Sequence, residues 1–200
     1  MLNKKFGLLV LVAIGVMLYF LFSKRECIDA ASVPFNDIED FDVILSQGQS
    51  VESKIIRLLN FSPGKSFSHA GIIFKENGVM RVLHATPDGT KENCLRYDDL
   101  QTFFNLSDAC DYAILRCRNM TEAQRGKLLT SFMRYRNEQH SFDYHFDNSE
   151  HNFIYCSELI WLIFNKAGIL NNIDFDLSKP IAPLDFLSCE KFRQIPLAKS

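Results

Sequence analysis

The chain has 200 residues, of which 47% are hydrophobic and 23% are charged, and its formal net charge at pH 7 is −2. This length fits one domain with a hydrophobic core and a short appendage. The nearly balanced charge gives no general electrostatic case for a nucleic-acid partner, so we expect none.

The first predicted element is a membrane anchor. Two lysines precede an uninterrupted apolar run over residues 6–22, and a Lys-Arg pair follows it. At 1.5 Å per residue the run spans roughly 26 Å, the short end of a bilayer crossing. The residues around Ala30 match a signal-peptide cleavage site poorly, although cleavage is the alternative. We therefore expect an uncleaved signal anchor at 1–25, a linker at 26–37 and one folded domain at 38–200.

Within the domain, strand-like segments come first and helical segments follow. We expect strands at 41–45, 70–75, 79–85 and 111–116, and helices at 51–59, 121–138, 155–167 and, as a final turn, near 181–187. The Asn-Gly pair at positions 77 and 78, between two β-prone runs, predicts a two-residue hairpin turn. Because hairpins rather than βαβ units connect the strands, the pattern predicts the α+β class.

The two longer helices carry signals at their ends. Thr121 is followed three residues later by Gln124, which predicts a capping box at the start of the first helix. Gly168 is placed to close the second helix. The second helix is apolar almost all round, so we expect it in the middle of the domain.

Cys156 lies in the first turn of this apolar helix. A helix N-terminus lowers the pKa of a thiol through its unpaired N–H groups and its dipole, and this favours the nucleophilic thiolate. The backbone N–H of Cys156 could also stabilise an oxyanion in acyl transfer. The alternative is a buried structural cysteine, which is a common state of free cysteine. The six cysteines show no CxxC pair and no zinc spacing, and any disulfide is left open. No segment has the pattern of a nucleotide, flavin or metal site, so we expect neither a metal nor a cofactor.

His69 and His84 belong to the two strands of the predicted hairpin. A two-residue turn pairs Glu76 with Val79, and this register places both histidines on one face as diagonal neighbours, roughly 7–8 Å apart. His69 would then take the proton of Cys156, and His84 would orient the ring of His69. The alternative is two ordinary core or surface histidines.

Other titratable residues are candidates for supporting roles. Asp42 and Asp143 are the alternatives to His84 as the orienting group. Glu158 lies on a different side of the helix from Cys156, and we expect it to brace a neighbouring loop. Three more histidines surround the loop before the helix and are expected at the rim of the site or in solvent, with metal binding as the alternative: His140, His145 and His151.

In combination, these segments resemble the permuted papain-like proteins of the NlpC superfamily, and among them the YiiX/YaeF-like bacterial amidases. The residues that carry the likeness are Ser68-His69-Ala70-Gly71, His84-Ala85, Phe142-Asp143, Tyr155-Cys156-Ser157-Glu158 and Ile181-Ala182-Pro183-Leu184-Asp185-Phe186. The resemblance runs from about Phe41 to Leu187. It implies a half-barrel antiparallel sheet packed on the Cys-bearing helix, with Cys156 as nucleophile and His69 as base. Residues 38–200 would then form a cysteine hydrolase domain.

One position departs from the bacterial group, which often has glutamate where this chain has His84. A histidine there resembles the lecithin:retinol acyltransferase-like branch of the superfamily, which uses two histidines and a later cysteine. The expected substrate is therefore an amide of a cell-wall peptide or, alternatively, an acyl ester or amide of a lipid. A third hypothesis is an inactive binding module of the envelope. We expect a single-pass membrane protein whose catalytic domain lies outside the cytoplasm, in the periplasm or cell envelope of a bacterium.

Overall fold

The computed structural model describes residues 33, 37–47, 67–87, 92–106, 112–149 and 151–196. Its centre is an antiparallel sheet with the strand order β4-β3-β2-β1-β5-β8. These strands are β1 (Val43–Ser46), β2 (His69–Glu76), β3 (Val79–Ala85), β4 (Leu95–Asp99), β5 (Tyr112–Cys117) and β8 (Phe192–Gln194). Two short parallel strands, β6 (Ser141–Phe142) and β7 (Phe153–Ile154), form a separate sheet.

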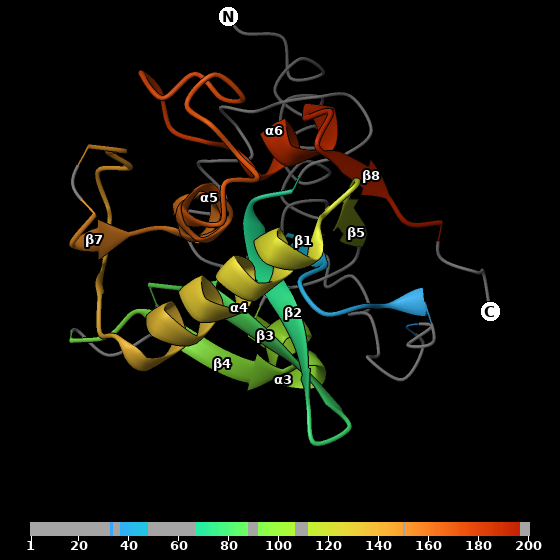
Figure 1. Ribbon diagram of the computed structural model, residues 1–200. Coiled ribbons are helices and arrows are strands. Elements are labelled where there is room, and N and C mark those ends of the chain that lie inside the picture. Colours follow the sequence, from blue (N-terminus) through green and yellow to red (C-terminus); the bar gives the residue numbers. More distant parts are fainter. Residues whose placement is uncertain are drawn as a thin grey trace, which may run out of the picture.

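Helices cover both faces of the main sheet (Figure 1). They are α3 (Leu100–Leu106), α4 (Glu122–Asn137), α5 (Cys156–Lys166) and α6 (Pro183–Ser188). Because side chains alternate along a strand, β1 contributes residues to two hydrophobic clusters, one on each face of the sheet. Val43 and Leu45 pack in the cluster that contains the apolar residues of α4 and α5, whereas Ile44 packs in the cluster of α3. The predicted antiparallel sheet packed on the Cys-bearing helix is therefore confirmed.

The helix α5 is buried, as its apolar sequence predicts. Every residue from Cys156 to Phe164 is buried. The helix ends where Gly168 adopts a φ of 71°, a left-handed conformation that glycine takes without steric cost. This helix consequently forms the middle of the core, with its first residue held against the start of β2.

The β2–β3 hairpin has the predicted register. Glu76 pairs with Val79, and the pairing continues in step to Ile72 and Leu83. Asn77 and Gly78 both have positive φ, as a two-residue turn of the I′ type requires. Since no residue is inserted between the strands, side chains on one face of β2 stay aligned with those on the same face of β3.

Other predicted elements differ in part from the structure. The strand expected at 41–45 begins at Val43, because Phe41 has a φ of 73° and cannot continue an extended strand. The capping box of Thr121 and Gln124 is present at the start of α4. The strand β4, the helix α3 and the strand β8 were not predicted. The helix expected at 51–59, the anchor at 1–25 and all of the linker except residues 33 and 37 lie outside the described residues.

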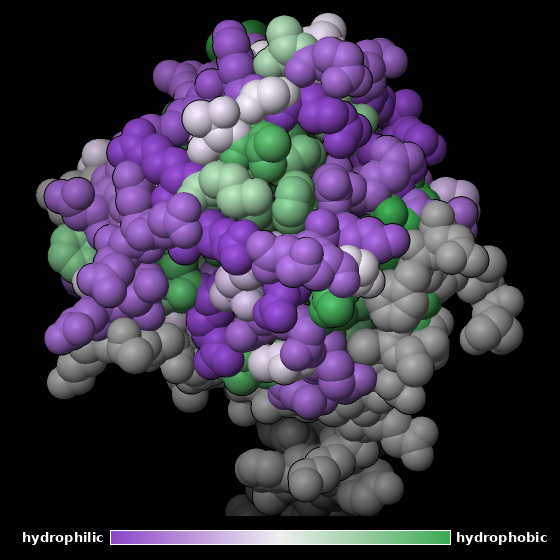
Figure 2. All heavy atoms as spheres, turned by 60° about the horizontal axis from the view of Figure 1, so that its bottom comes forward, coloured by the Kyte–Doolittle hydropathy of each residue, from purple (hydrophilic) through white to green (hydrophobic). Residues whose placement is uncertain are grey.

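Among the helices that the structure describes, none combines the length and the apolar character that a bilayer crossing needs. Figure 2 shows the face that carries the turn between β2 and β3. Hydrophilic residues cover most of this face around a compact hydrophobic area. Val79, at the start of β3, is an apolar residue with 47% of its surface exposed.

Candidate active site

The start of α5 is held in place by the residue before it. Tyr155 is the N-cap residue of the helix, and its ring is buried. Its hydroxyl accepts the backbone N–H of Ile181 at 2.8 Å and donates to the side-chain oxygen of Asn148. These bonds join two loops that are distant in sequence to the residue next to Cys156. The position of the thiol is therefore set by tertiary contacts as well as by the helix.

The thiol of Cys156 lies in a dry environment, because the residue is only 5% exposed. Burial raises the pKa of this thiol, and that effect outweighs the hydrogen bonds that lower it, from the Ser157 side chain and from the backbone N–H groups of Ala70, Ser157 and Cys156 itself. The prediction of a lowered pKa was wrong for the resting protein. Helix N–H groups do favour the thiolate, but desolvation disfavours the charge more strongly.

The two hairpin histidines are in contact, as the register predicted. Nε2 of His69 lies 2.9 Å from Nδ1 of His84, and the ring planes are nearly perpendicular at 82°. Phe103 of α3 stacks on His69 and meets His84 edge-on. Burial lowers the pKa of both rings, for His69 well below 6.5, with the neighbouring His84 lowering it further.

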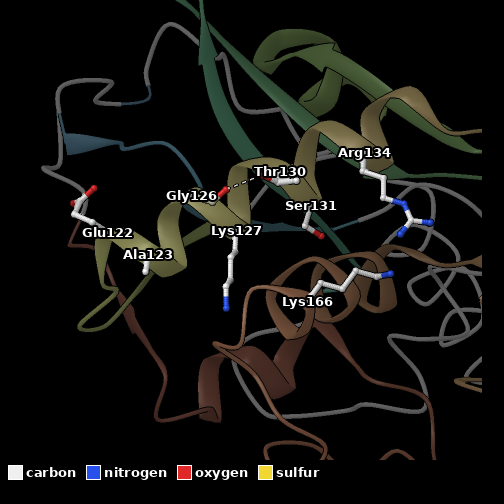
Figure 3. A pocket seen from close by; sticks show the side chains of 8 residues that line it. All are labelled: Glu122, Ala123, Gly126, Lys127, Thr130, Ser131, Arg134 and Lys166. Carbon is white, nitrogen blue, oxygen red and sulfur yellow. Dashed lines mark hydrogen bonds between the residues drawn. The ribbon is translucent and has the colours of Figure 1, made fainter.

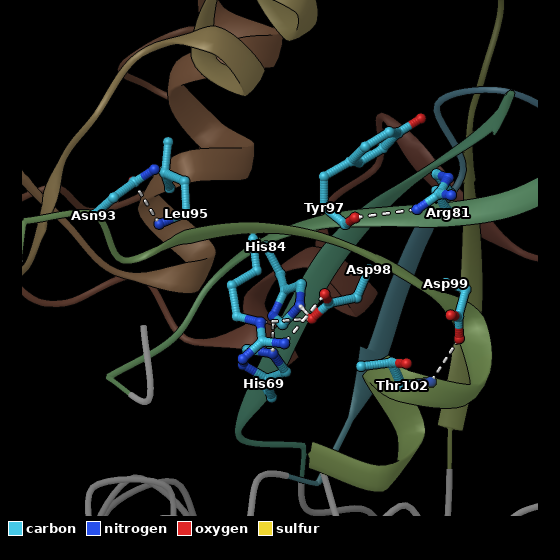
Figure 4. A network of polar contacts seen from close by, with 10 residues as sticks. His69, Arg81, His84, Asn93, Leu95, Tyr97, Asp98, Asp99 and Thr102 are labelled. Atoms are coloured by element: carbon cyan, nitrogen blue, oxygen red, sulfur yellow. Dashed lines mark hydrogen bonds and ion pairs between the residues drawn. The ribbon is translucent and has the colours of Figure 1, made fainter. Parts of the chain in front are cut away.

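A third polar residue, Asp98, completes this cluster, and sequence reasoning missed it. Its Oδ2 lies 3.2 Å from Nε2 of His84, and Arg96 donates to both carboxylate oxygens, at 2.7 and 3.2 Å (Figure 4). Partial burial raises the pKa of Asp98, but the hydrogen bonds and charges of His84 and Arg96 outweigh it and lower the pKa to about 2. Because β4 pairs with β3 so that Arg96 is opposite His84, Asp98 is the diagonal neighbour of that ring.

The two carboxylates that the sequence offered for the orienting role lie elsewhere. Asp42 is bound by Arg116, at 2.8 and 2.9 Å, near the start of β1. Asp143 accepts the backbone N–H groups of His145 and Asp147 in the loop before α5. Both carboxylates are engaged in local structure, so the structure does not support either alternative for the orienting role.

The structure places Cys156 beside the strand of His69 without a hydrogen bond between the two side chains. The thiol sulfur faces the backbone N–H of Ala70, the residue after His69. Nε2 of His69 is engaged with His84, so Nδ1 is the ring nitrogen that remains to face a thiol. In resting enzymes such contacts are often long and tighten when substrate binds. The candidate nucleophile thus lies beside the strand that carries the candidate base.

Glu158 braces a loop, as expected. Its Oε1 lies 2.9 Å from Nδ1 of His151, and its side chain is fully buried. Burial raises the pKa of this carboxyl to about 8, and the charge of Asp143 adds to the rise. His140 lies 3.3 Å from Glu138 at the end of α4.

A depression of about 640 Å³ lies between α4 and the last turn of α5 (Figure 3). Lys127, Arg134 and Lys166 line it together with small polar side chains. Neither Cys156 nor the paired histidines line it, so this depression is separate from the candidate active site.

A solved structure has a similar fold. It is that of the metalloprotein yiiX from Escherichia coli O157:H7, with a TM-score of 0.62 and 18% sequence identity. The match covers 81% of this chain and 98% of that chain. At this identity the likeness shows the fold alone. The comparison with curated proteins gave no match.

The description of yiiX as a metalloprotein raises the question of a metal site here. In the part of the chain that the structure describes, no group of three or more His, Cys, Asp or Glu side chains is placed to hold a metal ion. The described residues therefore do not fit a metal centre.

A sequence model of one protein family matches residues 37–184, which contain the buried helix, the hairpin and the candidates Cys156, His69 and His84. The family is described as permuted papain-like amidase enzymes, YaeF/YiiX, of the C92 family. The resemblance inferred from short motifs is thus confirmed over most of the domain. This chain belongs to the permuted papain-like amidases of the YaeF/YiiX family and is a cysteine hydrolase of that type.

Proposed function

We propose that Cys156 is the nucleophile of this amidase, that His69 is its general base and that His84 orients His69. We further propose that the enzyme is anchored in a bacterial membrane by residues 6–22 and cleaves amide bonds of cell-wall peptides outside the cytoplasm. The observation that carries the catalytic part is the contact of 2.9 Å between Nε2 of His69 and Nδ1 of His84. His69 lies in β2, and the backbone N–H of the next residue, Ala70, faces the thiol of Cys156.

The chemistry follows from the ring nitrogen that is available. Nδ1 of His69 takes the proton of Cys156, and the sulfur attacks the amide carbonyl carbon. The backbone N–H of Cys156 stabilises the negative oxygen of the tetrahedral intermediate. His69 then gives the proton to the leaving amine, and the C–N bond breaks to leave a thioester. Water, deprotonated by His69, attacks the thioester, and the proton returns to the sulfur as the acid leaves.

The location and substrate rest on other observations. The apolar run over 6–22, with charges at both ends, supports the anchor. The description of the family as amidases supports an amide rather than an ester. The presence of His84 keeps lipid acyl groups as the second candidate, since paired histidines occur in the lipid-directed branch that the sequence resembles.

Labelling with a thiol-reactive electrophile tests the nucleophile. We expect peptide mass spectrometry of the wild-type chain to find the label at Cys156, and Cys156→Ala to lose it. Cys94→Ala is the matched control, because it removes a second buried thiol, one that donates to the carbonyl oxygen of Ile154 at 3.6 Å, and the label at Cys156 should persist in it. Labelling that persists in Cys156→Ala contradicts the proposed nucleophile.

Turnover separates the substrate classes. Wild type and Cys156→Ala are incubated with cell-wall peptides and, separately, with phospholipids and N-acyl lipids. Release of amine from the peptides by wild type alone supports the proposal, whereas turnover of lipids alone replaces the substrate. Binding of cell-wall fragments without turnover of any substrate would instead identify an inactive binding module.

A further inference from the structure

Asp98 extends from β4 towards the paired histidines. The side chain is 16% exposed. Its polar contacts are Nε2 of His84 at 3.2 Å and the guanidinium of Arg96, which donates to Oδ2 from Nε and to Oδ1 from Nη2. Figure 4 shows the carboxylate pointing to the rings. A chain of polar contacts therefore runs from Arg96 through Asp98 and His84 to His69.

This chain has a direction that the contact between the histidines alone does not define. An ionised carboxylate only accepts hydrogen bonds, so the proton of neutral His84 must be on Nε2. Nδ1 of His84 then holds a lone pair and accepts from Nε2–H of His69. With its own proton on Nε2, His69 has its lone pair on Nδ1, where a base for the thiol is needed.

Without the carboxylate the opposite arrangement becomes available. His84 could hold its proton on Nδ1 and donate it to Nε2 of His69. The proton of His69 would then be on Nδ1, and the ring could not accept one from Cys156. The hydrogen bond of 2.9 Å between the rings is compatible with both arrangements, so the choice falls to the group on the far side of His84.

The charge of Asp98 has a second effect. A proton taken by His69 creates a cation among buried rings, including the stacked Phe103, where desolvation opposes it. The negative charge beyond His84 opposes that cost, and Arg96 holds the carboxylate in place while weakening its field. The hydrogen bond and charge of Asp98 raise the pKa of His84 against the larger effect of burial.

On the basis of the proposed function, we propose that Asp98 is a positioning residue of the active site, which acts through His84 to place the basic lone pair of His69 on Nδ1.

The direct test is the protonation pattern of the two rings in the full-length wild-type chain. Long-range ¹H–¹⁵N NMR correlations distinguish the two tautomers of a neutral imidazole. We expect the proton on Nε2 in both His69 and His84. A proton on Nδ1 of His84 overturns the proposal, and this measurement needs neither a variant nor a substrate.

The variant test uses Asp98→Asn, which keeps the shape but removes the charge and adds an N–H₂ donor. We expect kcat/KM to fall by about 10²-fold or more, because the amide can impose the wrong tautomer on His84. The NMR pattern should change with it. Asp98→Glu keeps the charge and should recover part of the activity. Asp98→Asn with wild-type tautomers, or with kcat/KM within about threefold of wild type, contradicts the proposal.

The matched control is Asp99→Asn. The neighbouring Asp99 accepts the N–H of Thr102 at 2.8 Å at the start of α3, and asparagine caps a helix equally well. Asp99→Asn changes charge and size as Asp98→Asn does, but at a carboxylate that bonds to Thr102 and not to His84. Activity and tautomers should therefore stay as in wild type. If wild type turns over no amide but Asp98→Asn shifts the tautomers, the proposed function fails while the positioning role of Asp98 stands.

Discussion

At the scale of single residues, burial sets the charge state of the proposed nucleophile and the proposed base. It raises the pKa of the Cys156 thiol and lowers the pKa of His69. Both shifts favour neutral partners, so the resting pair is a thiol and an imidazole rather than a thiolate and an imidazolium. In the proposed mechanism the thiolate then forms only as His69 removes the proton during attack, so the proposed rate depends on this ring.

This arrangement predicts activity that persists into acid. The proposed mechanism needs neutral His69, and because its pKa lies well below 6.5, the ring stays neutral as the pH falls past 6.5. We expect the acid limb of the kcat/KM profile to have its midpoint below 6.5. Circular dichroism over the same pH range controls for unfolding. A midpoint at or above 6.5 would show that the ring is not desolvated in the active enzyme.

At the scale of elements, the β2–β3 hairpin determines the geometry of the histidines. Gly71 is part of β2, at a point where the neighbouring strand β3 approaches closely. A Cβ at this position would overlap Cγ1 of Val82 and come within 3.1 Å of the carbonyl oxygen of Leu83 and 3.2 Å of Cβ of His84. The hairpin can bring His84 to His69 in this way because residue 71 has no side chain.

Gly71→Ala should therefore damage both stability and catalysis. The added methyl must push β3 away, and such overpacking costs about 1–3 kcal/mol in the free energy of unfolding. Because the displaced strand carries His84, we also expect kcat to fall by about tenfold or more. Urea denaturation and steady-state kinetics measure the two effects.

The control for this variant is Thr121→Ala. It removes the capping box of α4 and should cost about 1 kcal/mol, with kcat unchanged, because the cap lies away from the histidines. Equal effects of both variants on kcat would mean that lost stability, not the displaced strand, explains the lower rate of Gly71→Ala.

At the scale of the whole molecule, stability is linked to pH through a carboxyl group in the core. Glu158 has no exposed surface, and its Oε2 has no hydrogen-bond partner among the described residues. Burial raises its pKa from 4.5 to about 8. Between those values the native state binds more protons than the unfolded state, so this group reduces stability as the pH rises from 4.5 to about 8.

Glu158→Gln removes the titration and keeps the shape. We expect the variant to gain stability relative to wild type as the pH rises, by about 4 kcal/mol between about pH 5 and pH 9. Denaturant unfolding at intervals of pH measures the gain, and Glu190→Gln on the surface serves as the control. A difference between Glu158→Gln and wild type that does not vary with pH would show that the carboxyl does not titrate in this range.

Local sequence patterns were enough to predict several parts of the fold and the site. Asn77-Gly78 between two β-prone runs defined the hairpin and its register, and this register was sufficient to bring His69 and His84 together. The apolar pattern and Gly168 defined α5, and with it the placement of Cys156 at a helix start. These predictions succeed because neighbours in sequence determine turns, alternation and helix ends.

Two features of the site depended on contacts between distant segments. Asp98 lies on an edge strand whose polar sequence, Leu-Arg-Tyr-Asp-Asp, lacks clear alternation, and only its pairing with β3 brings the carboxylate to His84. The charge state of Cys156 depends on how completely β2 and the surrounding core exclude water from the thiol. Sequence patterns alone were thus sufficient to select Cys156, His69 and His84 as candidates. Their protonation and the contact with Asp98 depend on the folded chain, because desolvation and non-local pairing act only after folding.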